Sequence, residues 1–261
     1  MLKESPIGVF DSGVGGLSVF SELVKILPSE NYIYFGDTKN LPYGNKTKEE
    51  LVEITRKIFD FFKLKGVKAV VMACNTTSAL TFDVLKNDYD FKIYPVVQTV
   101  SKNIATQGFN NIGVFATMGT INSHAYKNEI TKHNQNANVF EIACPEWVKI
   151  VENELFEEEN SIRNVKMHLD EMLINNVDKI ILGCTHYPYL LDVLAKFTDK
   201  KMFINPAKSF AEHIKTDLKN SNLLNYKNEY TTKFYVSSNP KQFISAAKLF
   251  YKVENAEEIN L

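Results

Sequence analysis

Apolar runs of strand character alternate with helix-like segments along the N-terminal part of the chain. Each run is followed by a loop of small polar residues, and apolar side chains then recur at helical spacing. The expected elements are strands over 7–10, 32–35, 69–73 and 93–97 and helices over 17–27 and 47–65. A β-loop-α pattern of this kind is typical of a parallel sheet that helices cover on both faces.

The same alternation then starts a second time. Its expected elements are strands over 112–116, 139–143, 179–182, 202–205 and 233–236 and helices over 125–133, 148–175, 210–218 and 242–250. Between the last two helices, the asparagine-rich stretch 220–228 is expected to be a solvated loop. Two rounds of the pattern predict an α/β fold of two doubly wound parallel-sheet lobes, with the active site in the cleft between them.

Chemically suggestive polar residues stand at the carboxyl ends of expected strands. They are Asp11, Asp37, Cys74, Thr117 and Cys184. In open parallel sheets, ligands bind outside the carboxyl ends of the strands. The positions of these residues therefore predict one shared site.

Two cysteines occupy matching contexts. Val70–Thr77 and Ile180–Tyr187 are each an apolar run that ends on a cysteine, Cys74 or Cys184, and continues with small polar residues. A free cysteine is usually buried and inert, but backbone N–H groups and a helix dipole at a strand end lower the pKa of a thiol. We therefore expect two reactive thiols that face each other. One thiolate would take a proton from a carbon, and the other thiol would return a proton to the opposite face.

Two other interpretations of the cysteines are weaker. Cys144 also ends an expected strand, but Pro145 follows it and no polar cluster does, so we expect a structural residue. Cys74, Cys184 and His186 would supply three zinc ligands. Because the Cys-x-His spacing is poor for two ligands of one ion, we expect no metal site.

Two loops carry further candidates. Asp11-Ser12-Gly13-Val14-Gly15-Gly16 has neither the spacing of a dinucleotide fingerprint nor the Gly-Lys-Ser/Thr ending of a P-loop. It is either a capped βα turn or an N–H-lined turn that holds an anionic group, with Asp11 near the reacting centre or a substrate ammonium. Pro42-Tyr43-Gly44 is either a plain turn or a lid that holds the substrate.

Small polar residues and a histidine follow the two cysteines. Asn75, Thr76 and Thr185 stand at helix starts, where they either capture a carboxylate or simply cap a helix. His186 is either structural or placed to orient the neighbouring thiol and balance its proton. Glu152 lies in an otherwise ordinary helix, and its surroundings alone indicate a surface residue.

Composition narrows the class of protein. The 261 residues are 44% hydrophobic and 23% charged with a formal net charge of -1, which is ordinary for a globular protein and argues against a nucleic-acid surface. No apolar run approaches the roughly 18 to 20 residues of a membrane span, and no signal peptide is visible at the N-terminus. Three cysteines fit reduced thiols better than a disulfide framework, so we expect a cytoplasmic protein that binds a small molecule.

Taken together, the motifs resemble those of the glutamate racemases in the aspartate/glutamate racemase superfamily. The matching stretches are Gly8–Val19, Gly36–Thr38 with Pro42–Gly44, Ala73–Thr76, Leu182–Pro188 and, more weakly, Val236–Pro240. They are spread over most of the chain at compatible spacing, so the joint match is far more specific than any one motif.

The resemblance implies a cofactor-independent interconversion of L- and D-glutamate by a homodimer, supplying D-glutamate for bacterial peptidoglycan. It implies that Cys74 and Cys184 carry the protons. Asp11, His186 and Glu152 would assist them, which moves Glu152 from the surface to the catalytic set. The substrate contacts that it implies are Asp11, Ser12, Pro42, Tyr43, Gly44, Asn75, Thr76, Thr185 and His186.

The family fold also implies domain boundaries. Residues 1–97 together with 207–261 would form the N-terminal lobe, and residues 98–206 the second lobe. Two pairs depart from the family pattern, Gln98-Thr99 and Glu146-Trp147. We expect the first pair to affect the hinge and the second to affect packing or an interface, and neither to touch the chemistry.

Two alternatives stay open. One is an aspartate or other amino-acid racemase of the same superfamily, which would differ in the length of its pocket. The other is a non-catalytic amino-acid-binding protein with two lobes, in which the cysteines are only structural.

Overall fold

Strands and helices alternate along the chain. The strands are β1 (Ile7–Asp11), β2 (Tyr32–Gly36), β3 (Ala69–Met72), β4 (Lys92–Pro95), β5 (Asn111–Ala116), β6 (Asn138–Ala143), β7 (Lys179–Gly183), β8 (Phe203–Ile204), β9 (Thr232–Val236) and β10 (Glu257–Glu258). The α-helices are α1 (Leu17–Ile26), α2 (Lys48–Leu64), α3 (Asn75–Leu85), α4 (Val96–Ala105), α5 (Met118–Asn122), α6 (Ala125–His133), α7 (Trp147–Glu152), α8 (Glu159–Leu173), α9 (Leu191–Leu194), α10 (Pro206–Asn220) and α11 (Pro240–Ala247). Short 3-10 helices are η1 (Thr38–Asn40), η2 (Tyr43–Asn45), η3 (Tyr187–Leu190) and η4 (Lys200–Met202).

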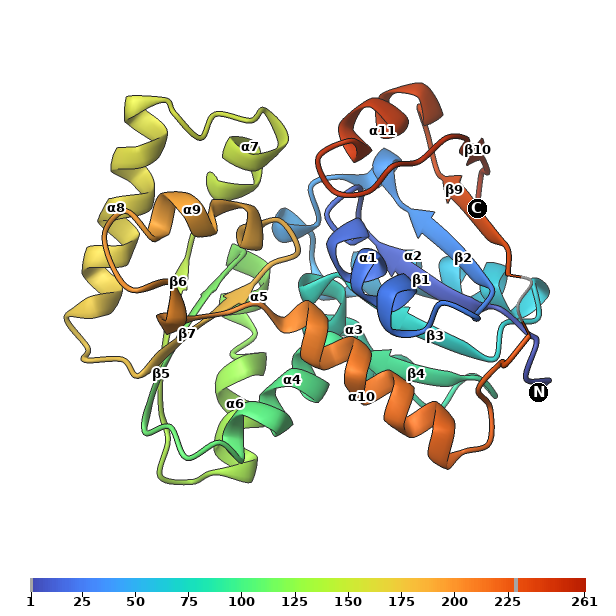
Figure 1. Cartoon of the computed structure of the whole chain (residues 1–261), viewed down its shortest axis with the longest axis horizontal. Helices are drawn as coiled ribbons and strands as arrows, with labels where there is room; N and C mark the ends of the chain where they lie inside the picture. Colours follow the sequence, from blue (N-terminus) through green and yellow to red (C-terminus); the bar gives the residue numbers. More distant parts are fainter. Residues whose placement is uncertain (1, 228–229) are drawn as a thin grey trace.

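The strands form two parallel sheets that lie side by side (Figure 1). The computed structural model describes residues 2–227 and 230–261. Within these ranges, one sheet has six strands in the order β10-β9-β2-β1-β3-β4, and the other has four in the order β6-β5-β7-β8. All the pairings between these strands are parallel. The expected α/β fold with two parallel-sheet lobes is confirmed.

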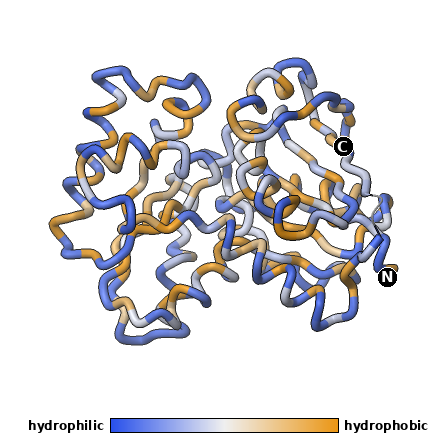
Figure 2. Tube along the Cα trace, viewed as in Figure 1, coloured by the Kyte–Doolittle hydropathy of each residue, from blue (hydrophilic) through white to orange (hydrophobic). Residues whose placement is uncertain are grey.

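Helices cover both faces of the six-stranded sheet. Successive strand residues point to opposite faces, and buried hydrophobic residues lie on each face. On one face, Phe10 and Met72 share a hydrophobic core with Phe62 of α2. On the other face, Val9 and Tyr34 share a core with residues of α1, α10 and α11. In Figure 2, hydrophobic residues recur along the strands inside each lobe, whereas most outer loops are hydrophilic. Of the helices in the described ranges, none is long and apolar enough to cross a membrane.

The four-stranded sheet is also covered on both faces. Gly113 of β5 faces α8, since a Cβ atom at this position would lie 2.6 Å from Sδ of Met172. Gly183 of β7 points to the opposite face and to α6, since a Cβ atom there would lie 3.0 Å from Cε2 of Tyr126. At the junction of the two lobes, α10 packs against α1 and α4 (Figure 1).

Three of the differences from the expected elements concern β4, the pair α7 and α8, and β10. The strand expected over 93–97 ends at Pro95, and Val96 begins α4, whose buried residues recur at helical spacing. The helix expected over 148–175 is divided into α7 and α8 by the segment 153–158. The strand β10 has no counterpart among the expected elements, because both of its residues are exposed and give no hydrophobic pattern.

The chain returns to the first sheet after α10. β9 pairs with β2, from Thr232 opposite Tyr32 to Val236 opposite Gly36. Of the expected lobe boundaries, residue 97 falls within α4 and residue 206 begins α10. We keep the division into 1–97 plus 207–261 and 98–206 as a proposal.

The stretch 220–228 is only partly the solvated loop expected. Residue 228 lies outside the described residues, and Asn220 ends α10. Leu224 and Asn225 are buried, so the expectation is wrong for both. The backbone N–H of Asn225 donates to Glu30 and its side-chain amide donates to the carbonyl oxygen of Ser29, which holds the segment against the first lobe.

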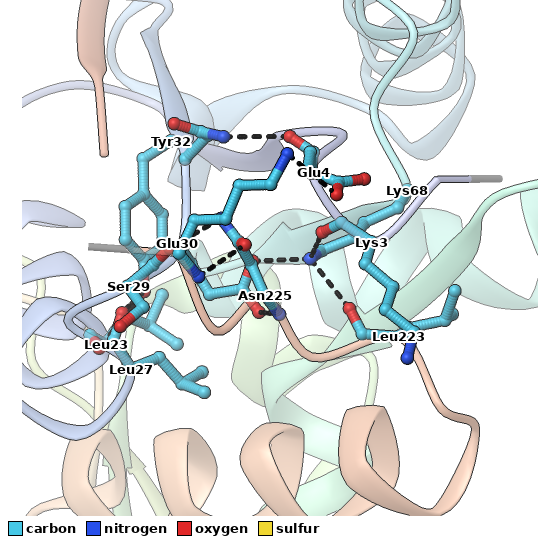
Figure 3. Close-up of polar contacts among 12 residues, drawn as sticks. Lys3, Glu4, Leu23, Leu27, Ser29, Glu30, Tyr32, Lys68, Leu223 and Asn225 are labelled. Carbon is cyan, nitrogen blue, oxygen red and sulfur yellow. Dashed lines mark hydrogen bonds and ion pairs between the residues drawn. The ribbon is translucent and has the colours of Figure 1, made fainter. Parts of the chain in front are cut away.

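Lys68 and Glu30 form an ion pair in which both side chains are buried (Figure 3). Nζ of Lys68 lies 2.5 Å from Oε2 of Glu30 and also donates to the carbonyl oxygens of Lys3 and Leu223. Burial raises the pKa of Glu30 and lowers the pKa of Lys68, so desolvation outweighs the pairing for both charges. The pair therefore joins segments around residues 3, 30, 68 and 223, which are far apart in the sequence.

Candidate active site

A cavity of about 320 Å³ lies between the two lobes. Cys74 follows β3 and Cys184 follows β7, so the two cysteines reach this cavity from different sheets. The volume is near the lower end of the usual range for ligand sites, about 300 to 1,000 Å³, and suits a small ligand. The sequence-predicted residues that line the cavity are Ser12, Pro42, Tyr43, Gly44, Cys74, Asn75, Thr76, Glu152, Cys184, Thr185 and His186.

Cys74 holds its proton tightly. Its side chain is buried, and the residue is the N-cap of α3. Burial and the nearby charge of Asp11 raise the pKa of Cys74 to about 12, and hydrogen bonds from Thr77 oppose this only in part. The expected lowering of the thiol pKa is therefore wrong for Cys74, because desolvation outweighs the helix dipole.

Cys184, His186 and Glu152 form a hydrogen-bonded chain. Nδ1 of His186 lies 3.8 Å from Sγ of Cys184, and Nε2 lies 3.0 Å from Oε1 of Glu152. Burial disfavours a charged ring, but the two hydrogen bonds outweigh it and raise the pKa of His186 to about 10. At neutral pH the ring therefore carries a positive charge between the sulfur and the carboxylate. Across the described ranges, no group of three or more His, Cys, Asp or Glu side chains is placed to hold a metal ion.

Asp11 lies behind the cavity and not in its wall. It is buried at the end of β1, where Oδ2 accepts a hydrogen bond from the backbone N–H of Gly13 at 3.1 Å. Oδ1 has no hydrogen-bond partner among the described residues. Burial raises the pKa of Asp11, and the charge of His186 opposes that rise. Asp11 therefore interacts with Cys74 on one side of the site and with His186 on the other through its charge. It does not line the cavity.

The glycine-rich turn 11–16 lets the two lobes come close. A Cβ atom at Gly15 would lie 2.4 Å from Cε1 of His186 and 2.4 Å from Oγ1 of Thr185, so a side chain does not fit there. Oγ of Ser18, in the first turn of α1, donates to the carbonyl oxygen of Thr185 at 3.0 Å. The turn therefore supports the segment that follows Cys184.

Asp37 fixes the loop that covers one side of the cavity. Its buried carboxylate accepts hydrogen bonds from the hydroxyl of Tyr43 and from Nδ2 of Asn40. Gly44 lies against Thr117 of the other lobe, since a Cβ atom at Gly44 would be 3.4 Å from Cβ of that residue. Asp37 itself does not line the cavity, so its part is to hold the lining loop in place.

Threonine hydroxyls join the two lobes beside the cavity. Oγ1 of Thr76 lies 2.9 Å from Oγ1 of Thr117, which lies 3.0 Å from Oγ1 of Thr120. Thr117 follows the expected strand over 112–116 and lines the cavity, as its place among the strand-end residues predicts. The lining residues that the sequence did not indicate are Leu41, Asn45, Met118, Pro145, Glu146, Val148 and Lys149.

The departure at Glu146-Trp147 reaches the site. Glu146 lines the cavity, and its carboxylate lies 3.3 Å from Nζ of Lys149, which also lines it. Glu146 therefore lies in the cavity wall, and the expectation that this pair does not touch the chemistry stays a prediction. Trp147 is buried and packs against Phe115 and Tyr187, which agrees with the expected effect on packing.

The departure at Gln98 lies behind α3. Oγ of Ser78 donates to Oε1 of Gln98 at 2.9 Å, and Nε2 of Gln98 donates to the carbonyl oxygen of Ser78 at 3.1 Å. The glutamine therefore ties α4, at the junction of the lobes, to the helix that begins after Cys74.

Comparison with known proteins gives relatives along the whole chain. The family model for Asp/Glu/Hydantoin racemases matches residues 7–214. The curated glutamate racemase 1 of Caldanaerobacter subterraneus is 40% identical over 263 residues, covering 100% of this chain and 98% of its own. The glutamate racemase of Thermoanaerobacter pseudethanolicus is 37% identical and covers 100% of this chain and 99% of its own.

A solved structure shares the fold. The glutamate racemase of Francisella tularensis, in complex with D-glutamate, matches with a TM-score of 0.93 and 32% identity over 99% of this chain and 98% of that one. The sequence identity and coverage, together with the match to the family model, show a common family and not only a common fold. The chain therefore belongs to the glutamate racemases of the Asp/Glu/hydantoin racemase family, and it is an isomerase and not a non-catalytic binding protein.

Proposed function

We propose that this isomerase interconverts L- and D-glutamate by proton transfer between two thiols and the α-carbon, without a cofactor. The observation that carries the proposal is that Cys74 and Cys184 line one small cavity from different lobes. Inversion of a carbon requires a base on one side and an acid on the other, and a thiolate with a thiol meets this requirement. The curated relatives that span the chain are named glutamate racemases, which supports glutamate over aspartate.

The two thiols have unequal surroundings. Because the pKa of Cys74 is about 12, this residue enters the reaction as the proton donor. Sγ of Cys184 lies 3.8 Å from Nδ1 of His186, which we assign as the group that balances the proton of this thiol, so Cys184 enters as the base. The roles exchange when the reaction runs backwards.

The polar groups around the thiols suit a substrate with two carboxylates and an ammonium group. Asn75, Thr76 and Thr185 are short donors on the wall, and the N-terminus of α3 adds a favourable dipole for an anion. The buried charge of Asp11 favours the ammonium group nearby. Pro42, Tyr43 and Gly44 then close the cavity over the substrate side chain.

The proposal is tested by incubating the protein with L- or D-glutamate in deuterated water. We expect α-deuterium incorporation and loss of optical rotation from either enantiomer, with no added cofactor and no effect of a metal chelator. Exchange with aspartate but not with glutamate would move the assignment to the aspartate racemases. Absence of exchange with any amino acid would overturn the two-thiol chemistry.

Replacing Glu152 by glutamine should shift the alkaline limb of the pH profile. The carboxylate helps to raise the pKa of His186 to about 10, so the charged ring is lost only as the pH rises through that value. Without the carboxylate the ring loses its proton at a lower pH. We therefore expect kcat/KM to fall about tenfold at pH 9, with a smaller loss at pH 7, since one charge-assisted hydrogen bond is removed.

The control for this variant is Glu157→Gln, an exposed glutamate in the segment that follows α7. Its pH profile should match that of the unmodified enzyme. An alkaline limb at the same pH in Glu152→Gln would show that this carboxylate does not support His186. The cytoplasmic location stays a prediction from the cysteine content, and the homodimer and the use of D-glutamate in peptidoglycan synthesis stay predictions of the family resemblance.

A further inference from the structure

Tyr126 reaches across the junction of the two lobes. It lies in α6, in the second lobe, and its side chain is fully buried. Its hydroxyl donates a hydrogen bond of 2.7 Å to Oδ1 of Asn75, the first residue of α3. Asn75 adjoins Cys74 and lines the cavity, whereas Tyr126 does not line it. A group outside the cavity thus contacts a side chain in its wall.

This hydrogen bond decides which way the amide of Asn75 faces. An asparagine side chain has one oxygen that accepts and one nitrogen that donates two hydrogen bonds. A phenol that donates to Oδ1 holds this oxygen away from the cavity and leaves Nδ2 on the opposite side. Within the described residues, Nδ2 of Asn75 donates to no protein acceptor. The N–H groups are therefore free for the carboxylate of a ligand.

The ring of Tyr126 also touches the other half of the site. A Cβ atom at Gly183 would lie 3.0 Å from Cε2 of Tyr126, so the ring packs against the residue before Cys184. Burial and the charge of Cys184 raise the pKa of the phenol, which keeps it a hydrogen-bond donor throughout the working pH range. One side chain thus contacts the residue after Cys74 and the residue before Cys184.

We infer that Tyr126 is a positioning residue for this active site. It orients the amide of Asn75 toward a substrate carboxylate and sets the two cysteine-bearing segments relative to each other. It does not touch the substrate and takes no proton from it. The inference rests on the proposed function, because it assigns Asn75 to a carboxylate of the amino-acid substrate.

The test is Tyr126→Phe, which removes one oxygen atom and keeps the ring. We expect KM for both glutamate enantiomers to rise about three- to tenfold, the usual effect of losing one neutral hydrogen bond. Because the enantiomers have equal free energies, kcat/KM must fall by the same factor in both directions. The matched control is Tyr32→Phe, since Tyr32 is also buried but donates to backbone carbonyl oxygens far from the cavity. The KM of Tyr32→Phe for glutamate should not change.

A double-mutant cycle with Asn75→Ala separates positioning from general stability. If Tyr126 acts through Asn75, Tyr126→Phe should raise KM no further in the Asn75→Ala background. A residue with only a structural role would lower Tm and leave KM unchanged. An unchanged KM in Tyr126→Phe, or the same fold-change in both backgrounds, would overturn the inference. Failure of the unmodified protein to racemise glutamate would count against the proposed function instead.

Discussion

Cys74→Ser and Cys184→Ser should each lower the rate of glutamate racemisation by about a thousandfold or more, in both directions. Each variant keeps a proton carrier on one side of the cavity and loses the other. A serine hydroxyl is far less acidic than a thiol, so it neither takes the α-proton nor returns one at a useful rate. Polarimetry or chiral chromatography, from pure L- and pure D-glutamate, measures the loss.

Deuterated water makes this prediction sharper. A variant with one remaining thiol can still remove and return a proton on a single face, so it should exchange the α-proton of one enantiomer without inverting it. The two variants should exchange opposite enantiomers. Cys144→Ala is the control, because Cys144 is buried outside the cavity lining and its thiol donates to the carbonyl oxygen of Ile142 at 3.7 Å. Normal turnover in either serine variant would disprove the two-thiol mechanism.

The cysteine pair could be predicted from the sequence because an apolar run followed by small polar residues indicates where a buried strand ends. Cys74 and Cys184 each follow an apolar run, and ligands bind outside the carboxyl ends of the strands of a parallel sheet. The raised pKa of Cys74 could not be found in this way. It depends on burial and on Asp11, which ends the neighbouring strand β1, and only the folded sheet sets that proximity.

The misplaced start of α4 has a similar cause. Val96 and Val97 are β-branched and follow Pro95, which favours a strand when propensity alone is considered. In the fold, both valines are buried together with Val100 and Ile104, and this spacing is helical. Burial in the folded protein therefore outweighs the strand propensity of the two valines. The propensity of Pro95, Val96 and Val97 alone does not show where the helix begins.

Lys68→Met should lower the free energy of unfolding by about 3–5 kcal/mol, because it leaves the Glu30 carboxylate buried without its counter-charge. The carbonyl oxygens of Lys3 and Leu223 lose the same donor. Methionine replaces most of the lysine stem, so the loss comes from charge and hydrogen bonding and not from a cavity. Urea unfolding with an unchanged m-value measures the difference.

Lys92→Met is the control, since Nζ of Lys92 lies 2.7 Å from Asp217 and the two side chains are 35% and 37% exposed. It should lose about 1 kcal/mol or less.

The double variant Lys68→Met/Glu30→Gln tests the physical reason for this loss. Burial raises the pKa of Glu30 and lowers that of Lys68. For each residue, the cost of desolvating the charge therefore exceeds the attraction to the opposite charge. Removing both charges should therefore recover at least half of the stability lost in Lys68→Met. Glutamine also keeps an oxygen that can accept the backbone N–H of Asn225, which Glu30 accepts at 3.0 Å. If the double variant were as unstable as the single one, the ion pair would stabilise the protein by its own attraction, and the bare charge would not be the cause.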